Sequence, residues 1–154
     1  MIKNYENNKM SKTKGIEIKL VKNKKELSDV FKIREVVFVK EQNVPRDIEM
    51  DEFDTNSKHF IVLYSNKPIG CARIRFIGKM AKLERIALLK RYRGKGFGKI
   101  MMNYLIKYCK NKNVEEIVMN AQYYLKNYYD KFGFRPKGKT FMEAGIKHIE
   151  MYQK

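Results

Sequence analysis

A glycine-rich, basic run joins an apolar stretch to an amphipathic helix pattern, and this junction limits the possible folds more than any other feature. The apolar stretch covers Leu83 to Leu89, the run is Arg-Tyr-Arg-Gly-Lys-Gly-Phe-Gly-Lys over Arg91 to Lys99, and the helical pattern continues to about Lys110. Glycines let a backbone approach a ligand closely, and the first turn of a helix presents unpaired N–H groups to an anion. The junction therefore predicts a strand, a phosphate-binding turn and a helix in direct succession.

The spacing of the glycines argues against two common phosphate loops. A Walker loop needs four residues between its glycines and then Gly-Lys-Ser/Thr, and neither Ser nor Thr follows here. A dinucleotide fingerprint needs its third glycine one residue later than Gly98. A basic, glycine-rich turn without any ligand stays open as an alternative.

Length and composition are those of one small globular domain. The chain has 154 residues, of which 44% are hydrophobic. It has no apolar run near the roughly 18 residues that a membrane span needs. The N-terminus lacks the apolar region of a signal peptide, so we expect a cytoplasmic protein. Cys71 and Cys109 lie in apolar patterns that indicate buried free thiols, and His59 and His148 are far apart, so no metal site is expected.

The formal net charge of +17 raises the question of nucleic-acid binding, but the distribution of charge argues against it. Lysines are spread over every segment, as in a general compositional bias. The stretch Glu41 to Asp54, here called the acidic lip, has six acidic residues against Arg46 alone. A basic body with one acidic lip suits a small-molecule site better than a duplex-binding face. A nucleic-acid-binding module that uses residues 94–110 remains the alternative from another class.

Hydrophobic periodicity predicts a mixed α/β order of elements. Residues 1–14 are polar and aperiodic and are expected to form a disordered tail, which leaves residues 15–154 as a single domain. The expected strands are Ile16 to Val21, His59 to Tyr64, Ile69 to Ile77, Met80 to Leu88, Glu116 to Asn120, Phe134 to Pro136 and Ile146 to Tyr152. The expected helices are Glu26 to Gln42, Gly94 to about Lys110 and Tyr123 to Phe132, with the acidic lip a loop that carries a short helical turn.

This order and four separated motifs resemble the GNAT N-acetyltransferases. Arg-x-x-Gly-x-Gly after a strand resembles their acetyl-CoA pyrophosphate loop, and Tyr129-x-Lys131-x-Gly133-Phe134 resembles the end of their fourth helix. The segments 34–45, with Val-Phe-Val-Lys-Glu-Gln, and 143–151 are similar to the first helix and the C-terminal signature of a small bacterial-type subfamily. The resemblance covers about residues 16–152. It implies the GNAT acyl-CoA N-acyltransferase fold, which is α/β (α+β), with a central, mixed, mostly antiparallel, twisted sheet flanked by helices.

The resemblance also implies an N-acetyltransferase with acetyl-CoA as its cosubstrate. The amine attacks the thioester directly in a ternary complex, so the site must hold the pyrophosphate, remove the ammonium proton and protonate the departing thiolate. The backbone of the strand before the loop is expected to pair with the pantetheine arm like an added strand. The expected cofactor-binding residues are Ile86, Ala87, Leu88, Arg91, Arg93, Gly94, Lys95, Gly96, Phe97, Gly98, Lys99 and Asn127.

Two residues are expected to carry the proton transfers. Tyr129 is the expected general acid for the thiolate because of its place in the family motif, and a packed aromatic is the alternative. Glu84 is the expected base, acting directly or through water, because strand alternation puts it and Ile86 on one face. The alternative for Glu84 is a structural carboxylate paired with Arg73 or Arg75.

The acceptor amine is the part of the reaction that the sequence constrains least. In the family the first helix and the loop after it form the acceptor wall, and the expected substrate-binding residues are Arg34, Gln42, Arg73 and His148. The acidic lip favours a cationic amine, whereas Arg34, Arg46, Arg73 and Arg75 favour a phosphate. We expect a small amine, with glucosamine 6-phosphate as the specific candidate and a polyamine or a protein lysine as the alternative. His148 is expected to line this pocket or to relay a proton. The protein is expected to be a monomer or a homodimer.

Overall fold

The computed structural model describes residues 15–154, and the expected tail over residues 1–14 lies outside them. The strands are β1 (Ile16–Leu20), β2 (Lys58–Tyr64), β3 (Lys67–Ile77), β4 (Met80–Leu88), β5 (Glu116–Gln122), β6 (Arg135–Glu143) and β7 (Ile146–Gln153). The α-helices are α2 (Lys24–Arg34), α3 (Arg46–Glu49), α4 (Phe97–Lys110) and α5 (Lys126–Asp130). A π-helix, η2 (Glu35–Glu41), and three 3₁₀ turns, η3 (Glu52–Asp54), η4 (Lys90–Tyr92) and η5 (Tyr123–Leu125), complete the description.

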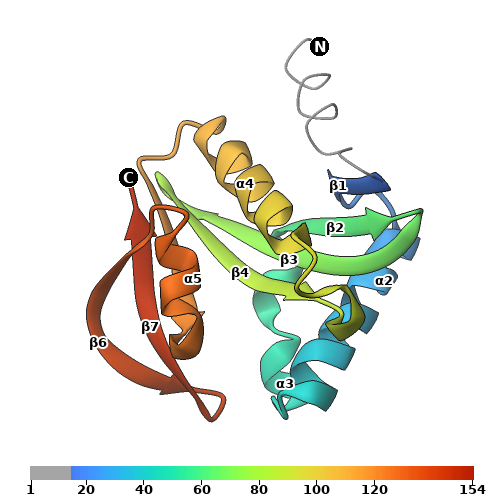
Figure 1. The fold of residues 1–154 in the computed structure, drawn as a ribbon, viewed down its shortest axis with the longest axis horizontal. Coiled ribbons are helices and arrows are strands. Elements are labelled where there is room, and N and C mark those ends of the chain that lie inside the picture. Colours follow the sequence, from blue (N-terminus) through green and yellow to red (C-terminus); the bar gives the residue numbers. More distant parts are fainter. Residues whose placement is uncertain (1–14) are drawn as a thin grey trace.

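The seven strands form one sheet in the order β1-β2-β3-β4-β5-β7-β6 (Figure 1). All neighbouring pairs are antiparallel except β4 and β5, which are parallel. A parallel pair needs a crossover connection, and α4 supplies it. The mixed, mostly antiparallel sheet flanked by helices is the fold that the sequence predicts.

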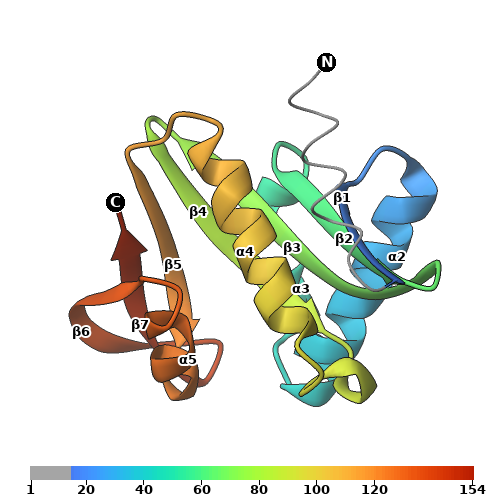
Figure 2. The same ribbon diagram turned by 45° about the horizontal axis from the view of Figure 1, so that its top comes forward.

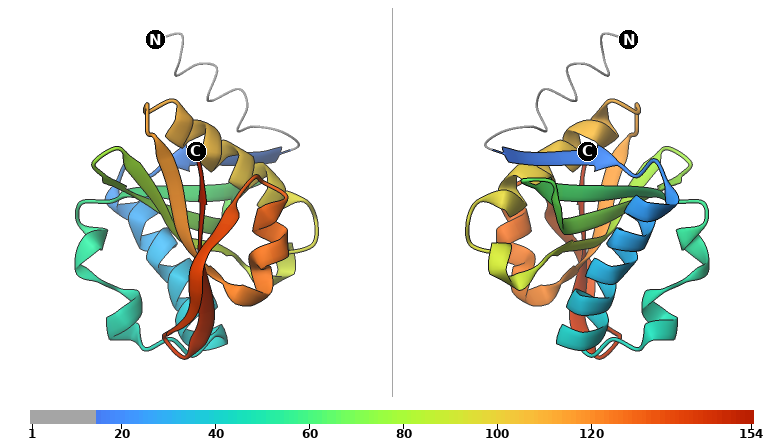
Figure 3. Two further views of the ribbon diagram at one scale, coloured as in Figure 1. Left: turned by 90° about the vertical axis from the view of Figure 1, so that its left-hand side faces the viewer. Right: turned by 90° about the vertical axis from the view of Figure 1, so that its right-hand side faces the viewer.

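Helices cover both faces of the sheet because its strands are apolar on both sides. On β2, Phe60 and Val62 pack in a core cluster with Met102 and Leu105 of α4. Ile61, between them, belongs to a second cluster with α2 and η2 on the opposite face. Period-two alternation thus sends successive side chains of one strand into two separate cores. Figure 3 shows the two faces, with α2 on one side and α4 on the other.

The first helix differs from the expectation of one regular helix over Glu26 to Gln42. The structure has α2 as far as Arg34 and then a π-helix, η2, over Glu35–Glu41. Four consecutive residues at 36–39 are apolar, so no hydrophobic period separates an α turn from a π turn there. Val37 and Phe38 are buried on the sheet. π-turns are frequent at functional sites, and this one lies on the wall of the site described next.

Two other boundaries differ for local reasons. α4 begins at Phe97 rather than at Gly94, because Gly94 and Gly96 have positive φ angles of 74° and 86° that a right-handed helix excludes. β6 runs to Glu143, far beyond the expected Pro136, and most of its residues are exposed. An exposed edge strand shows no alternation between apolar and polar residues, which is why its pattern was not visible in the sequence.

Candidate active site

The site lies where β4 and β5 separate. The two strands pair only from Met80–Glu116 to Leu83–Met119, after which their remaining residues no longer face each other in register. Figure 2 shows the strands spreading apart below α4. A pocket of about 850 Å³ fills the gap, lined on one side by β4 residues 84–88 and on the other by β5 residues 119–122. The backbone of β4 is therefore open to a ligand along its last five residues.

A β-bulge in β4 causes the separation. Arg73 of β3 pairs with Glu84 and Cys71 pairs with Ala87, so two residues of β4 stand opposite one residue of β3. Arg85 has a positive φ of 54°, which is rare for a side chain with a Cβ. A bulge bends its strand and increases its twist. β4 consequently turns away from β5 at the point where the pocket opens.

The glycine-rich loop opens onto the same pocket. A Cβ added to Gly94 or Gly96 would meet no atom within 4 Å, so both glycines face open space. Gly96 is the N-cap of α4 and offers no side chain to the first turn of that helix. The N–H groups of this turn are available to an anionic ligand, as the sequence predicts.

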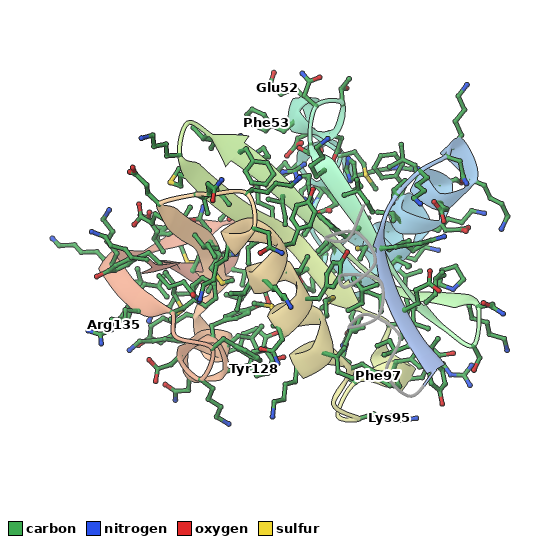
Figure 4. All side chains as sticks on the ribbon, turned by 90° about the horizontal axis from the view of Figure 1, so that it is seen from above. Glu52, Phe53, Lys95, Phe97, Tyr128 and Arg135 are labelled. Atoms are coloured by element: carbon green, nitrogen blue, oxygen red, sulfur yellow. The ribbon has the colours of Figure 1, made fainter. Side chains whose placement is uncertain are left out.

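Most of the expected cofactor residues line the pocket, and four do not. The lining residues are Ile86, Ala87, Leu88, Arg93, Gly94, Gly96, Gly98 and Lys99. Phe97 packs its ring 5.0 Å from that of Tyr64, and the Arg91 guanidinium lies 5.2 Å from the ring of Tyr92. Lys95 and Asn127 are exposed outside the lining. In Figure 4 Lys95 lies at the edge of the molecule, on the turn before α4.

Tyr128 and Tyr129 of α5 both line the pocket, in different surroundings. Tyr129 is 8% exposed and packs edge-on against Tyr128 and Phe134. Burial raises the pKa of Tyr129 above its ordinary value of 10.0, so the phenol stays protonated at neutral pH. The Tyr128 hydroxyl lies only 2.7 Å from where a Cβ on Gly98 would stand. Figure 4 shows Tyr128 between α5 and the start of α4.

Glu84 lines the pocket but is also held by two arginines. Its Oε1 accepts a hydrogen bond from Arg75 Nε at 2.5 Å, and its Oε2 lies 3.0 Å from Arg73 Nη2. Both oxygens therefore already face a guanidinium group. This is the structural pairing that the sequence left open as the alternative to a base.

The arginines expected to bind a substrate phosphate are buried away from the pocket. Arg34 is 0% and Arg73 is 1% exposed, and neither is a lining residue. Arg34 contacts Glu49 at 2.8 Å and Asp54 at 2.7 Å, and Arg73 contacts Asp51 at 2.6 Å. Burial and carboxylate partners keep both guanidinium groups away from a ligand in the pocket, so the expectation for Arg34 and Arg73 is corrected.

Three of the six acidic residues of the lip turn inward for the same reason. Glu49, Asp51 and Asp54 are the partners of the buried arginines, and Arg85 joins them through Glu49 and Asp51, each at 3.0 Å. These three carboxylates and the arginines pair in one largely buried ionic network, whereas Asp47 and Glu52 of the lip are exposed. Sequence reasoning missed these ion pairs because the paired residues lie far apart in the chain, for example by 15, 22 and 34 positions.

The remaining acceptor wall comes from η2, the end of β5 and the β6–β7 hairpin. Gln42 accepts a hydrogen bond of 2.8 Å from Gln122, and both line the pocket. Glu143 and His148 line it from the hairpin, with His148 Nε2 3.6 Å from a Glu143 oxygen. The expectations that Gln42 and His148 lie beside the pocket agree with their positions. Gln122 and Glu143 were not anticipated, although Glu143 begins the C-terminal motif.

An ion pair lies at the mouth of the pocket. Arg93 of the loop makes a bidentate contact with Glu41 of η2, at 2.5 and 2.9 Å, across the mouth of the pocket.

Within residues 15–154 no cluster of three His, Cys, Asp or Glu side chains is suited to hold a metal ion. Over the same range no helix is both long enough and apolar enough to span a membrane.

Comparison with known proteins links this geometry to one family. The sequence model of the acetyltransferase (GNAT) domain matches residues 22–154. YjcF of Bacillus subtilis, an uncharacterized N-acetyltransferase, is 41% identical over 86% of this chain and 95% of its own. The crystal structure of Escherichia coli ElaA superposes with a TM-score of 0.81 at 24% identity, over 90% of this chain and 99% of ElaA. A GNAT family acetyltransferase from Elizabethkingia anophelis with acetyl-CoA bound gives 0.70 at 18% identity, over 92% and 99%.

Proposed function

The chain belongs to the GNAT acetyltransferase family and is an acetyl-transferring enzyme, and on that premise we propose that it acetylates the primary amine of a small cationic molecule. The observation that carries the choice of acceptor is the charge of the wall. Arg34 and Arg73 are buried and paired with carboxylates of the ionic network, whereas the side chain of Glu143 is half exposed at the pocket. A carboxylate beside amide groups suits an ammonium ion better than a phosphate.

The cofactor half of the pocket fits acetyl-CoA, which supplies the activated acetyl group. The pyrophosphate is assigned to the N–H groups of the first turn of α4 and to the open space at Gly94 and Gly96. The pantetheine arm is assigned to the unpaired backbone of β4 over residues 86–88. Both assignments place the thioester near the point where β4 and β5 separate.

The chain's own residues then serve a direct attack. The wall formed by Gln42, Gln122 and Glu143 orients the amine, which raises its effective concentration at the carbonyl. Tyr129 is assigned as the donor to the departing thiolate, because it is protonated and lines the pocket. Backbone N–H groups of the free β4 edge are assigned to polarise the carbonyl.

Glucosamine 6-phosphate, the candidate favoured by the arginines in the sequence, now has less support. Of the arginines invoked for it, Arg46 is 74% exposed on its side chain and Arg75 holds Glu84. A peptide lysine remains the second candidate, because Tyr124 and Ile48 expose large apolar surfaces while they line the pocket. Exposed apolar residues at a site mouth are a common feature of peptide-binding sites.

Calorimetry followed by an amine panel tests the proposal. Acetyl-CoA should bind, and Gly96→Asp should abolish binding, because a carboxylate would stand where the pyrophosphate is assigned. Spermidine, glucosamine 6-phosphate and a lysine peptide should then be compared by release of free thiol. The proposal predicts turnover of spermidine and none of the phosphorylated sugar. The reverse order would refute the acceptor class, and retained affinity in folded Gly96→Asp would refute the loop assignment.

A further inference from the structure

We propose that His148 accepts the proton of the attacking ammonium at Nε2, with Glu143 holding the cation beside it. This inference rests on the proposed function and assigns the role of base, which Glu84 was expected to fill. It draws on the position of the ring, its tautomer and the state of each competing group.

The ring of His148 is buried at the wall of the pocket. The residue is 7% exposed, lies on β7 and faces Gln122 of β5 in register. On its other side the ring stacks on Phe141 of β6, with centroids 5.8 Å apart and planes 22° apart. Packing between two strands fixes the direction of the ring, so its nitrogens have defined roles.

One hydrogen bond sets the tautomer. His148 Nδ1 lies 2.7 Å from the carbonyl oxygen of Ile146, and a carbonyl oxygen can only accept. Nδ1 therefore carries the hydrogen, and in the neutral ring Nε2 keeps its lone pair. Nε2 is the atom on the side of Glu143, 3.6 Å from its Oε2. A proton acceptor with a fixed lone pair thus adjoins a carboxylate that attracts ammonium.

The other side chains that could act as the base already contact charged or polar groups of the protein. Both oxygens of Glu84 contact guanidinium groups, and Oε2 of Glu49 contacts Arg34 and Arg85. His59 lies outside the pocket lining and uses its Nε2 on the carbonyl oxygen of Asp54. Tyr129 is held in its protonated form by burial and so acts as a donor.

Glu143 is the charged group that faces the ring from β6. From β5 the ring meets the uncharged Gln122, and Lys147 on its own strand turns away to the ring of Tyr123 in η5, 4.3 Å from its centroid. A cation formed on His148 is therefore balanced by Glu143. The same carboxylate holds the ammonium before transfer.

The ammonium gives one proton to His148 Nε2, which passes it to solvent, and the freed electron pair forms the nitrogen–carbon bond. The carbon–sulfur bond breaks with its electrons on sulfur, which takes a proton from Tyr129. The second proton lost from nitrogen replaces the one that Tyr129 gave, so one proton is released per acetyl group transferred.

Nitrogen-15 NMR of the imidazoles tests the tautomer without any substrate. The chain has only two histidines, so a His148→Gln spectrum assigns both rings by difference. The proposal predicts that neutral His148 is protonated at Nδ1 in the wild-type protein. A neutral ring protonated at Nε2 would overturn it, because the lone pair would then be committed to the carbonyl side.

Rate measurements test the role itself with spermidine, and with the lysine peptide as a second probe. His148→Gln should lower kcat by about 10²- to 10⁴-fold at neutral pH, with a smaller loss at high pH where the amine is already neutral. Added imidazole should restore part of the rate. His59→Gln is the matched control and should keep the wild-type pH profile.

The outcomes separate the two proposals. A wild-type rate and pH profile in His148→Gln, with the loss appearing in Glu84→Gln instead, would overturn the role of His148 and leave the proposed function intact. Acetyl-CoA binding without thiol release on either amine would refute the proposed acceptor class, and the tautomer would still decide whether His148 is built as a base.

Discussion

Tyr129 and Tyr128 are neighbours in the chain, but their surroundings give them different tasks. Tyr129 is 8% exposed, and its raised pKa keeps the phenol protonated. Tyr128 places its hydroxyl against the first turn of α4, where only a glycine at position 98 leaves room for it. Tyr129 is the residue that we propose as the proton donor, and Tyr128 packs against the helix that follows the glycine-rich loop.

Tyr129→Phe should lower kcat and leave acetyl-CoA affinity nearly unchanged, because only a proton donor is lost. The expected loss is roughly 10²- to 10⁴-fold, the usual contribution of general acid catalysis. Steady-state rates and calorimetry on the same preparation give both numbers. Tyr128→Phe serves as the control, and an equal loss in both variants would show that the ring positions matter rather than the proton of Tyr129.

Gly98→Ala should destabilise the protein, because the new Cβ would lie 2.7 Å from the Tyr128 hydroxyl. The expected cost of overpacking is about 1–3 kcal/mol, less the roughly 1 kcal/mol that alanine gains over glycine in a helix. Combining it with Tyr128→Phe should recover most of the loss, and urea unfolding of the four proteins gives the coupling energy. Additive effects would mean that the two residues do not meet.

Single residues were predictable from the sequence where a motif fixed their place along the chain. Gly94, Gly96 and Tyr129 lie where their motifs place them. The position of Arg34 was not predictable in this way. A guanidinium group indicates a surface or ligand-binding residue until its partners, 15 and 20 residues away, are known. Ionic pairing at such separations has no periodic signature in a sequence.

At the scale of elements, the ionic network joins α2, α3, η3, β3 and β4. Arg34 of α2 contacts Glu49 of α3 and Asp54 of η3, and Arg73 of β3 contacts Asp54 and Glu84 of β4. The acceptor wall is thereby attached to the strand that forms the cofactor site. Loss of one member should loosen the wall as well as lower stability.

Arg34→Met should cost up to about 3–5 kcal/mol in the free energy of unfolding, because Glu49 and Asp54 each lose one of their two guanidinium partners in a buried network. Urea denaturation monitored by circular dichroism gives the value. Arg46→Met, at a surface arginine with a 3.4 Å contact to Glu35, is the matched control and should change stability by less than about 1 kcal/mol. Equal effects would contradict the special role of the network.

Acid should weaken the network in a defined direction. Burial alone would raise the pKa of Asp54, but hydrogen bonds and charge from Arg34 and Arg73 outweigh it and hold the pKa below the ordinary 3.8. Because the folded pKa is the lower one, this stabilisation is complete above the unfolded pKa and is lost as pH falls through the folded pKa. Wild type should therefore lose more stability than Asp54→Asn between roughly pH 5 and pH 2. Parallel losses would show that Asp54 titrates normally.

Elements were predictable wherever one face is buried and the other is polar. The central strands and α4 agree with the expected segments to within a few residues. The π-turn of η2 was not predictable, because its four apolar residues in a row fit several helical periods. Most of β6 was missed because neither of its faces is buried.

On the scale of the whole molecule, the two faces of the sheet support different parts of the proposed site. One core, with α4 and α5, supports the cofactor loop and Tyr129, and the other, with α2 and η2, supports the acceptor wall. The pocket passes through the sheet between β4 and β5, so each substrate is served by its own layer. The direct contact of Arg93 with Glu41 links the two layers at the mouth.

Acetyl-CoA should raise the melting temperature of the whole chain. At a concentration about 100 times Kd, binding stabilises the folded state by about 2.7 kcal/mol, or roughly 5–11 °C for a protein of this size. Duplex DNA should give no comparable shift at about 0.2 M salt, because the net charge of +17 supplies only screened, non-specific attraction. A salt-resistant shift with DNA and none with acetyl-CoA would favour the nucleic-acid alternative.

The place of β7 between β5 and β6 has a consequence for the order of assembly. β6 precedes β7 along the chain, but β7 is its sole neighbour in the sheet formed by residues 15–154. β6 therefore has a place in the sheet only when β7 is present, and the two strands can form a hairpin before β7 pairs with β5. Loss of β7 would therefore remove two strands from the sheet rather than one, along with His148. Within the described residues, the β6–β7 hairpin is thus attached to the sheet through the pairing of β7 with β5.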